Sequence, residues 1–307
     1  MIRRSVVASC IWAFGIAAAL SGCVSIAPVT VAAPPGVRGV PTGMQYLYGS
    51  GEAAAISRQA YAALTTYVSG RSRMHWPVGG GPTVRMLPQS VVLASDATLA
   101  APRFVDCVGK RPAIVLDVDE TALLNTGYEY ADAASGLPYD AARWERWERS
   151  DGRASGAVPG AVDALKAIRA LGVTVIFNSN RTAVNARYTE AALTRAGLGP
   201  VRHGETLFLK GDAPGGSAKD PRRAIIAARY CVIAMVGDQL GDMTDLFNAG
   251  LTPAQRRSAT AAPEVAGLWG NGWFLLTNPV YGTALAGDYD AVFPTDQRWV
   301  DPGTTKE

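Results

Sequence analysis

Histidine is scarce in this sequence, because only His75 and His203 carry an imidazole among its 307 residues. Haem carriers usually hold iron through His, Met or Cys, so haem binding has little support, although Met and Cys leave it open. Sustained runs of Lys and Arg are also missing, and the net charge is only +3. A nucleic-acid polymer is therefore not an expected partner. With 48% hydrophobic and 18% charged residues, the composition is otherwise that of a globular protein.

The N-terminus lacks a hydrophobic run long enough to span a membrane comfortably. Two arginines precede an uncharged stretch of fifteen residues, 6–20, and the sequence Leu-Ser-Gly-Cys follows. This arrangement predicts a secretory signal that is removed from the mature protein. The tetrapeptide also resembles the lipobox of bacterial lipoproteins, which implies a signal peptide over 1–22 and a lipid on Cys23. The alternative is an ordinary secretion signal with an incidental cysteine.

The residue after Cys23 is Val24 rather than Asp, which implies, by the same resemblance, sorting to the outer membrane. The expected location is the bacterial cell envelope, with the protein lipid-anchored and facing the periplasm. Residues 23–43 are rich in Ala, Val, Pro and Gly and show no helical or strand periodicity. This segment is predicted to be a tether between membrane and domain.

Two of the four cysteines remain once Cys10 in the signal and Cys23 are set aside, namely Cys107 and Cys231. An even pair in an oxidising compartment is compatible with a disulfide. Both precede apolar strands, so they could meet if those strands are neighbours. A disulfide and two unpaired cysteines, one of them buried, both stay open at this point.

Short apolar runs alternate with helical patterns along most of the chain. The predicted strands are residues 113–116, 173–177, 207–209, 232–236 and 273–276. The predicted helices are residues 51–70, 159–171, 182–196, 220–229 and 243–249. Such alternation is typical of a parallel sheet with helices on both faces. The expected fold class is α/β, with an N-terminal helical segment.

The most informative run is Asp-Val-Asp-Glu-Thr, which directly follows the first predicted strand. A bend at the strand tip can aim both Asp117 and Asp119 into one pocket. Two carboxylates there can divide the work, because one can attack or bind a metal while the other carries a proton. An apolar strand that leads into this run therefore indicates a candidate site.

In an open parallel sheet, a ligand lies beyond the carboxyl ends of the strands. The polar residues that follow the predicted strands are Asp117, Asp119, Asn178, Ser179, Asn180, Arg181, Lys210, Lys219, Asp238 and Asp242. Crowded carboxylates need a cation, and oxygen ligands of this kind suit Mg²⁺. A metal and a lysine can neutralise phosphate, while carboxylates supply the attack and the proton, so this set favours phosphoryl transfer.

These motifs, in this order, resemble those of the haloacid dehalogenase (HAD) superfamily, and within it the class C acid phosphatases (subfamily IIIB), which are bacterial lipoproteins. The motifs are Asp117-Val-Asp119-Glu-Thr121, Ser179-Asn180-Arg181, Lys219 and Gly237-Asp238-x-x-x-Asp242. Further matches are Trp144-x-x-Trp147, Val158-Pro159-Gly160-Ala161 and Asn278-Pro279-x-Tyr281-Gly282. The resemblance departs at Ala284, where the family has an aromatic residue followed by an acid, which puts the family's usual substrate contacts in doubt.

The resemblance implies Mg²⁺-dependent hydrolysis of a small phosphomonoester through an aspartyl-phosphate. Asp117 would be the nucleophile, and Asp119 would act first as general acid and then as base. Ser179 would hydrogen-bond the phosphoryl oxygens. Asn180 and Arg181 would border the phosphate.

The same resemblance places the metal on Asp117, the backbone carbonyl of Asp119, Asp238 and, directly or through another ligand, Asp242. A lysine would neutralise the phosphate. Lys210 and Lys219 both follow the third strand, and Lys219 is preferred because it lies at a helix start, in the motif's usual place.

An insertion at about 123–157 would form a cap, which in this superfamily covers the site and selects the leaving group. Trp144 and Trp147 share one helical face. They could stack a nucleobase or aryl group, or they could form the core of the cap. Tyr281 could likewise either contact the substrate or be a packing residue. A nucleoside monophosphate and an aryl phosphate both remain plausible substrates.

The expected layout is a signal over 1–22, a tether over 23–43, a HAD-like acid phosphatase domain over 44–290 and a C-terminal tail over 291–307. The membrane is the second expected partner, through the lipid on Cys23, and no oligomeric state is predicted. The alternative function is a non-catalytic ligand-binding lipoprotein on the same fold. Such a relative would be expected to have lost the attacking aspartate or a metal-binding one.

Overall fold

The computed structural model describes residues 39–75, 89–301 and 303. The signal predicted over 1–22, Cys23 and the larger part of the predicted tether lie outside these residues. Within the described ranges, none of the helices combines the length and the hydrophobicity that a membrane crossing requires.

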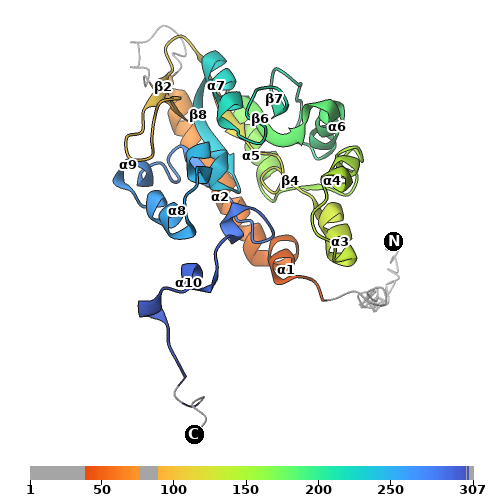
Figure 1. The fold of residues 1–307 in the computed structure, drawn as a ribbon. Coiled ribbons are helices and arrows are strands. Elements are labelled where there is room, and N and C mark those ends of the chain that lie inside the picture. Colours follow the sequence, from red (N-terminus) through yellow and green to blue (C-terminus); the bar gives the residue numbers. More distant parts are fainter. Residues whose placement is uncertain (1–38, 76–88, 302, 304–307) are drawn as a thin grey trace, which may run out of the picture. The chain divides into compact units, whose positions relative to one another are not determined.

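A five-stranded parallel sheet lies at the centre of the fold and confirms the predicted α/β class (Figure 1). The strand order is β7-β6-β3-β8-β9. The strands are β3 (Arg111–Leu116), β6 (Thr174–Thr182), β7 (Leu207–Lys210), β8 (Tyr230–Gly237) and β9 (Trp273–Leu275). Strand β3 lies in the middle, where every residue after Arg111 is buried. A continuous apolar strand suits this position, because helices cover both of its faces.

Helices cover both faces of the sheet, as predicted. On one face, α2 (Gly51–His75), α5 (Ala161–Ala170) and α6 (Ala186–Arg195) contribute apolar side chains to a single core cluster. On the other face, α7 (Asp220–Arg229) and α9 (Pro263–Ala266) contribute to a second cluster. The sheet is therefore the middle of three layers, and its strand ends are free to carry a site.

The other elements are shorter, and several of them had no strong signal in the sequence. The remaining helices are α1 (Thr42–Gly49), α3 (Thr126–Ser135), α4 (Ala141–Glu148), α8 (Pro253–Thr260) and α10 (Tyr289–Val292). The remaining strands are β1 (Gln89–Leu93), β2 (Phe104–Asp106), β4 (Leu123–Leu124) and β5 (Gly156–Ala157). Strands β1 and β2 form an antiparallel pair that was not predicted.

Strand β6 is longer than the sequence indicated. The strand predicted over 173–177 is present, but β6 continues to Thr182 and pairs with β7 along this extension. The side chains of residues 178–181 therefore alternate between the two faces of the sheet. The helix predicted over 182–196 accordingly begins later, at Ala186.

The prediction of an α-helix over 243–249 is wrong, since the structure has a single 3-10 turn there, Asp245–Asn248. The carboxylate of Asp245 accepts the backbone N–H groups of Lys219 (2.9 Å) and Asp220 (2.6 Å). Such side-chain bonds to the backbone compete with a regular helix. Here they hold the start of α7 in place.

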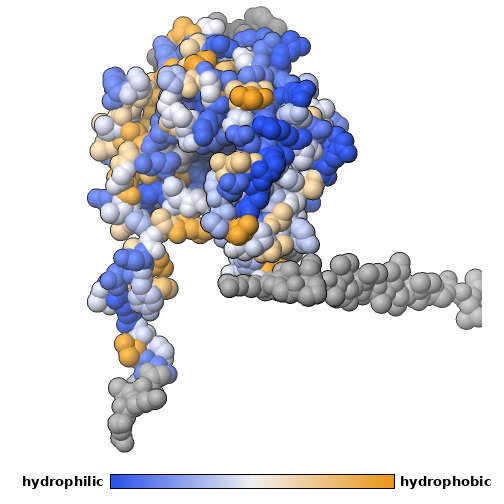
Figure 2. Space-filling view, turned by 45° about the vertical axis from the view of Figure 1, so that its right-hand side comes forward, coloured by the Kyte–Doolittle hydropathy of each residue, from blue (hydrophilic) through white to orange (hydrophobic). Residues whose placement is uncertain are grey.

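The predicted cap insertion begins and ends in a two-stranded antiparallel ribbon, because β4 pairs with β5. Helices α3 and α4 lie between these strands and are drawn in yellow-green in Figure 1. Figure 2 turns this side of the molecule forward, and hydrophilic side chains cover much of its right-hand half. Hydrophobic side chains occur there only in small separate groups.

Cys107, directly after β2, and Cys231 in β8 are joined by a disulfide. Both residues are buried, and their Cα atoms are 4.7 Å apart. Of the two alternatives that the sequence left open, the structure has the bonded one. The bridge joins residues 124 positions apart. In the chain-entropy model, a loop of this size stabilises the fold by about 4–5 kcal/mol.

We expect thiol labelling of the denatured, unreduced protein to leave Cys107 and Cys231 unmodified. Denaturation exposes both sulfurs, so only a covalent bond can protect them. Peptide mapping by mass spectrometry reads these two cysteines separately from the others in the chain. Reduction before labelling is the positive control and should modify both. Modification of either cysteine without reduction would contradict the disulfide.

Candidate active site

The carboxyl end of β3 carries the two aspartates of the Asp-Val-Asp-Glu-Thr run. The N–H of Asp117 donates to the carbonyl of Val236 on β8 (3.0 Å), which extends the ladder by one residue. The chain then turns through Glu120, whose φ is +53°. A residue other than glycine in this left-handed region is uncommon and marks a constrained turn. Asp117 and Asp119 thus lie at the strand tip.

Three aspartates meet at this edge of the sheet. Asp117, Asp238 directly after β8, and Asp242 in the next turn have carboxylate oxygens within 4.8 Å of one another. Their approach depends on Gly237, since a Cβ there would lie 2.1 Å from the Cβ of Asp242. The fold therefore brings together three of the residues predicted to hold a metal.

The electrostatics of this cluster favour a bound cation. Burial first, and then the charge of Asp242, raise the pKa of Asp238 to about 7. Burial also raises the pKa of Asp117 well above its ordinary value, against the opposing effect of Lys219. A divalent cation would favour the ionised form of both groups, and carboxylate oxygens are the ligands that hard cations take. The residues present therefore fit a divalent metal.

Neutral donors orient two of the three carboxylates. Thr121 Oγ1 and Asn278 Nδ2 each donate to Asp238 at 2.8 Å. The backbone N–H of Gln239 donates to Asp242 at 2.9 Å. Bonds of this kind fix the direction in which a ligand oxygen points.

Lys219 is the lysine that reaches the cluster. Its Nζ lies 2.5 Å from Asp117 Oδ1 and 2.6 Å from Asp242 Oδ1, and the residue is 6% exposed. Burial alone would lower the pKa of Lys219, but the two carboxylates raise it above the ordinary value. Lys210, the other candidate, is exposed at the end of β7. The structure thus brings Lys219, and not Lys210, to the aspartate cluster.

Asp119 faces a different set of partners from Asp117. Its Oδ1 accepts from Asn125 Nδ2 (2.8 Å) and from Arg181 Nε (2.9 Å). Its Oδ2 accepts only a long bond from Ser179 Oγ, at 3.4 Å, among the described residues. One oxygen of Asp119 is therefore held by two donors while the other is left nearly free.

The long strand β6 separates the Ser-Asn-Arg motif by face. Ser179 and Arg181 are buried and contact Asp119, as alternate residues on one face can do. Asn180 is exposed, and its Oδ1 accepts from Arg222 (2.5 Å). The structure therefore brings Ser179 and Arg181 to the site but engages Asn180 elsewhere.

Trp144 packs within the cap and against the site. Its Nε1 donates to Glu148 (2.9 Å), and its ring meets Tyr128 edge-on at 4.8 Å. Trp147 contacts the same Tyr128 ring at 6.2 Å. The guanidinium of Arg181 lies 5.9 Å from the centre of the Trp144 ring. The tryptophan pair thus contributes to the packing of the cap.

Glu120 is a buried residue that the sequence reasoning did not single out. Its carboxylate accepts from the hydroxyls of Tyr48 (3.0 Å) and Tyr281, and from the N–H of Asn125 (2.8 Å). Burial, followed by the charge of Asp119, raises its pKa to about 7. In the sequence, the feature that could have identified Glu120 is its place within the Asp-Val-Asp-Glu-Thr run. Tyr281, predicted to contact substrate, is 36% exposed and anchored here by its hydroxyl.

Glu148 of α4 was also not among the residues predicted from the sequence. Its hydrogen bonds connect the cap to the end of β6. Its carboxylate accepts from Thr182 Oγ1 (2.9 Å), Asn185 Nδ2 (2.7 Å) and Trp144. The residue is only 1% exposed. No sequence pattern singles it out, because its partners lie on elements that become neighbours only in the folded chain.

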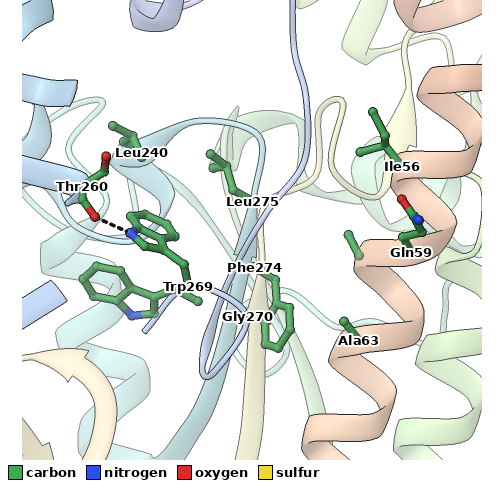
Figure 3. A pocket seen from close by; sticks show the side chains of 11 residues that line it. Ile56, Gln59, Ala63, Leu240, Thr260, Trp269, Gly270, Phe274 and Leu275 are labelled. Carbon is green, nitrogen blue, oxygen red and sulfur yellow. Dashed lines mark hydrogen bonds between the residues drawn. The ribbon is translucent and has the colours of Figure 1, made fainter. Parts of the chain in front are cut away.

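An apolar pocket of about 600 Å³ lies between α2 and β9 (Figure 3). Ile56 and Gln59 line one side, and Leu240 and Trp269 the other. The described residues that line it include no carboxylate and none of the predicted site residues. This pocket therefore does not fit the chemistry of a phosphate or a metal.

Comparison with protein families matches residues 85–284 to the acid phosphatases of HAD superfamily subfamily IIIB. The chain belongs to this family. Its structure is also similar to that of the class C acid phosphatase from Bacillus anthracis, at 23% identity and a TM-score of 0.60. A second structure of that enzyme, with tungstate bound, matches with a TM-score of 0.61. Each match covers 79% of this chain and 85% of the other, and shows a shared fold.

Membership of subfamily IIIB confirms the predicted resemblance and makes the chain a phosphoric monoester hydrolase that acts on small phosphomonoesters. HAD phosphatases generally use a divalent metal, and the aspartate cluster could hold one. The family therefore supports catalysis over the non-catalytic alternative. All four aspartates on which the chemistry would depend are present, namely Asp117, Asp119, Asp238 and Asp242.

Proposed function

We propose that this acid phosphatase forms an aspartyl-phosphate on Asp117 with the help of Mg²⁺. The observation that carries the proposal is the position of the Asp117 carboxylate. It lies between the Lys219 ammonium, 2.5 Å away, and two further carboxylates that complete a metal-competent cluster. A carboxylate held among cations can approach a phosphate dianion, because the surrounding positive charge offsets the repulsion.

In the first half of the reaction, an oxygen of Asp117 attacks phosphorus and the bond to the leaving oxygen breaks. Lys219 neutralises the phosphoryl oxygens, and the hydroxyl of Ser179 donates a hydrogen bond to them. Asp119 gives a proton to the leaving oxygen, so that an alcohol departs. Oδ2 of Asp119 suits this step, because Oδ1 is already held by Asn125 and Arg181.

In the second half, Asp119 takes a proton from a water molecule, and the resulting hydroxide attacks the phosphorus of the aspartyl-phosphate. The bond between phosphorus and Asp117 breaks, phosphate leaves, and the carboxylate is restored. Asp119 thus donates a proton in the first half of the reaction and accepts one in the second half.

Asp117, Asp238 and Asp242 would hold the Mg²⁺, together with the backbone carbonyl of Asp119. Bound there, the ion would supply Lewis-acid neutralisation of the phosphate charge. The chain's own contribution is to orient the ligand oxygens, through Thr121 and Asn278 on Asp238.

We further propose that the leaving group carries a flat ring, as in a nucleoside monophosphate or an aryl phosphate. Tyr281 and Trp144 supply aromatic faces at the site and in the cap, and such faces accept flat rings. Because the Arg181 guanidinium lies over the Trp144 ring, this ring offers one face rather than two.

The test of this function is hydrolysis of p-nitrophenyl phosphate by the full chain in detergent, at about pH 5–6. We expect activity with Mg²⁺, its loss in EDTA and its return when Mg²⁺ is restored. Tungstate, which is bound in the Bacillus anthracis enzyme, should inhibit as an oxyanion that resembles phosphate. Full activity in EDTA would contradict the metal assignment.

We also propose that the mature protein is anchored to the outer membrane by a lipid on Cys23, facing the periplasm. The support is the Leu-Ser-Gly-Cys sequence and the valine that follows it. The variant Cys23→Ala should lose labelling by radioactive palmitate and should no longer sediment with membranes. The variant Cys10→Ala changes a cysteine inside the signal and is the matched control. Unchanged lipid labelling in Cys23→Ala would exclude this anchor.

A further inference from the structure

Glu129, on the cap helix α3, is a buried carboxylate with no hydrogen bond or ion pair to any other described residue. Only 4% of the residue is exposed. A buried carboxylate without a donor is unfavourable, and proteins normally supply one. The cap nevertheless keeps Glu129 without a partner, although the neighbouring Asp132 is ion-paired with Arg143.

The position of Glu129 is set by Asn125, which precedes the first residue of α3. The N–H of Glu129 donates to the carbonyl of Asn125 (3.1 Å), so the two residues lie one helical turn apart. Residues at this spacing share a helix face. The side chain of Asn125 donates to Asp119 (2.8 Å). Glu129 therefore stands one turn beyond the residue that holds the proposed general acid.

The electrostatic neighbours of Glu129 agree with this position. Burial, and then the charges of Asp132 and Asp119, raise its pKa to about 7, against the opposing charge of Arg143. The charge of Glu129 in turn contributes, after burial, to the raised pKa values of Glu120 and Tyr48. Both of those residues belong to the network around Asp119, so Glu129 adds negative charge on that side.

The leaving group must lie on the Asp119 side of the phosphorus, because Asp119 protonates it. We propose, on the basis of the function proposed above, that Glu129 is a specificity-determining residue for this leaving group. Its carboxylate accepts a hydrogen bond from a hydroxyl or ammonium group of the substrate and disfavours a leaving group with a second negative charge. An incoming donor supplies the partner that the fold lacks, whereas an incoming anion adds repulsion.

Para-substituted phenyl phosphates test this inference, because they differ in charge but hardly in shape. The probes are 4-(aminomethyl)phenyl, 4-(hydroxymethyl)phenyl and 4-carboxyphenyl phosphate, with p-nitrophenyl phosphate as the reference. The measurement is kcat/KM for each, with the full chain in detergent and Mg²⁺, at about pH 5–6 and again at about pH 8, where a carboxyl with a pKa of about 7 is ionised. The order of preference is compared at the higher pH. In the unmodified protein, we expect the aminomethyl and hydroxymethyl substrates to be preferred over the carboxy substrate.

The variant Glu129→Gln removes the charge and should reduce the ratio of aminomethyl to carboxy kcat/KM about tenfold or more. We expect most of the change in KM, since the contact forms in the bound ground state as well as in the transition state. Glu129→Asp keeps the charge and should keep the order of preference, which covers the case in which the Gln variant folds poorly. Glu145→Gln makes the same change on an exposed position of α4 and is the matched control.

The outcomes separate the two proposals. If the unmodified protein hydrolyses none of the four substrates at either pH, the proposed function fails. If it hydrolyses them, but Glu129→Gln changes all four kcat/KM values by one common factor, Glu129 is only structural and the inference is overturned. A carboxy substrate preferred by the unmodified protein would overturn it as well.

Discussion

Replacing Asp117 by asparagine is expected to lower kcat for p-nitrophenyl phosphate by at least about 10⁴-fold. An amide is a poor nucleophile and cannot form the aspartyl-phosphate, while Lys219 still binds the phosphate and Asp238 and Asp242 still offer ligands to the metal. The loss should therefore appear in kcat far more than in KM. The measurement is steady-state kinetics with Mg²⁺, together with circular dichroism to show that the variant is folded.

Two controls make this result specific. Asp163→Asn makes the same chemical change at an exposed position of α5 and should leave the kinetics unchanged. Rapid acid quenching during turnover should trap phosphate on the unmodified protein and none on Asp117→Asn. If Asp117→Asn retained activity within tenfold of the unmodified protein, another group would have to attack phosphorus.

The second large effect is expected for Asp119→Ala, and it depends on the leaving group. An alkyl phosphate needs a proton on its departing oxygen, so its kcat/KM should fall about 10²–10⁴-fold. The p-nitrophenolate anion is stable without a proton, so the loss for p-nitrophenyl phosphate should be much smaller. The parameter kcat/KM suits this comparison because it reports on the steps up to the first irreversible one.

The control for Asp119→Ala is Asp163→Ala, an exposed aspartate changed in the same way. This control variant should leave kcat/KM unchanged for both substrates. Equal losses on alkyl and p-nitrophenyl phosphate with Asp119→Ala would mean that Asp119 acts on both by holding the site together. That result would point to its contacts with Arg181 and Asn125 instead of to proton transfer.

Proton transfer by Asp119 is compatible with its contacts because they are unevenly divided between its two oxygens. Arg181 and Asn125 both bind Oδ1, and Ser179 reaches Oδ2 only at 3.4 Å. The two donors can therefore set the direction of the carboxyl group while the other oxygen carries the proton. Glu120 strengthens this arrangement, because it holds the backbone N–H of Asn125.

The α/β class and the chain order of the site motifs could be predicted from the sequence. Apolar strands such as Arg111–Leu116 and amphipathic helices such as Asp220–Arg229 carry local periodicity, and burial of each element follows from its own pattern. Parallel strands also place their carboxyl ends at one edge, so Asp117 and Asp238 could be expected to be neighbours. These inferences need no knowledge of the distances between elements.

Only the tertiary structure decided which side chains reach the site. Lys210 is the last residue of β7 and Lys219 precedes α7, and the loop between them carries Lys219 to Asp117 while Lys210 stays exposed. Asn180 and Arg181 are adjacent in sequence, yet the added length of β6 engages only Arg181 with Asp119.

The disulfide between Cys107 and Cys231, and the carboxylates of Glu120 and Glu148, depend on contacts between segments far apart in the chain. Local patterns record whether a residue is buried and on which face of its own element. They do not record strand register, the path of a loop or the partner across an interface, because those are set by the packing of the whole domain. Local sequence patterns are therefore enough to predict the class of fold and the kind of chemistry, whereas the packing of the domain sets which of the candidate residues come together.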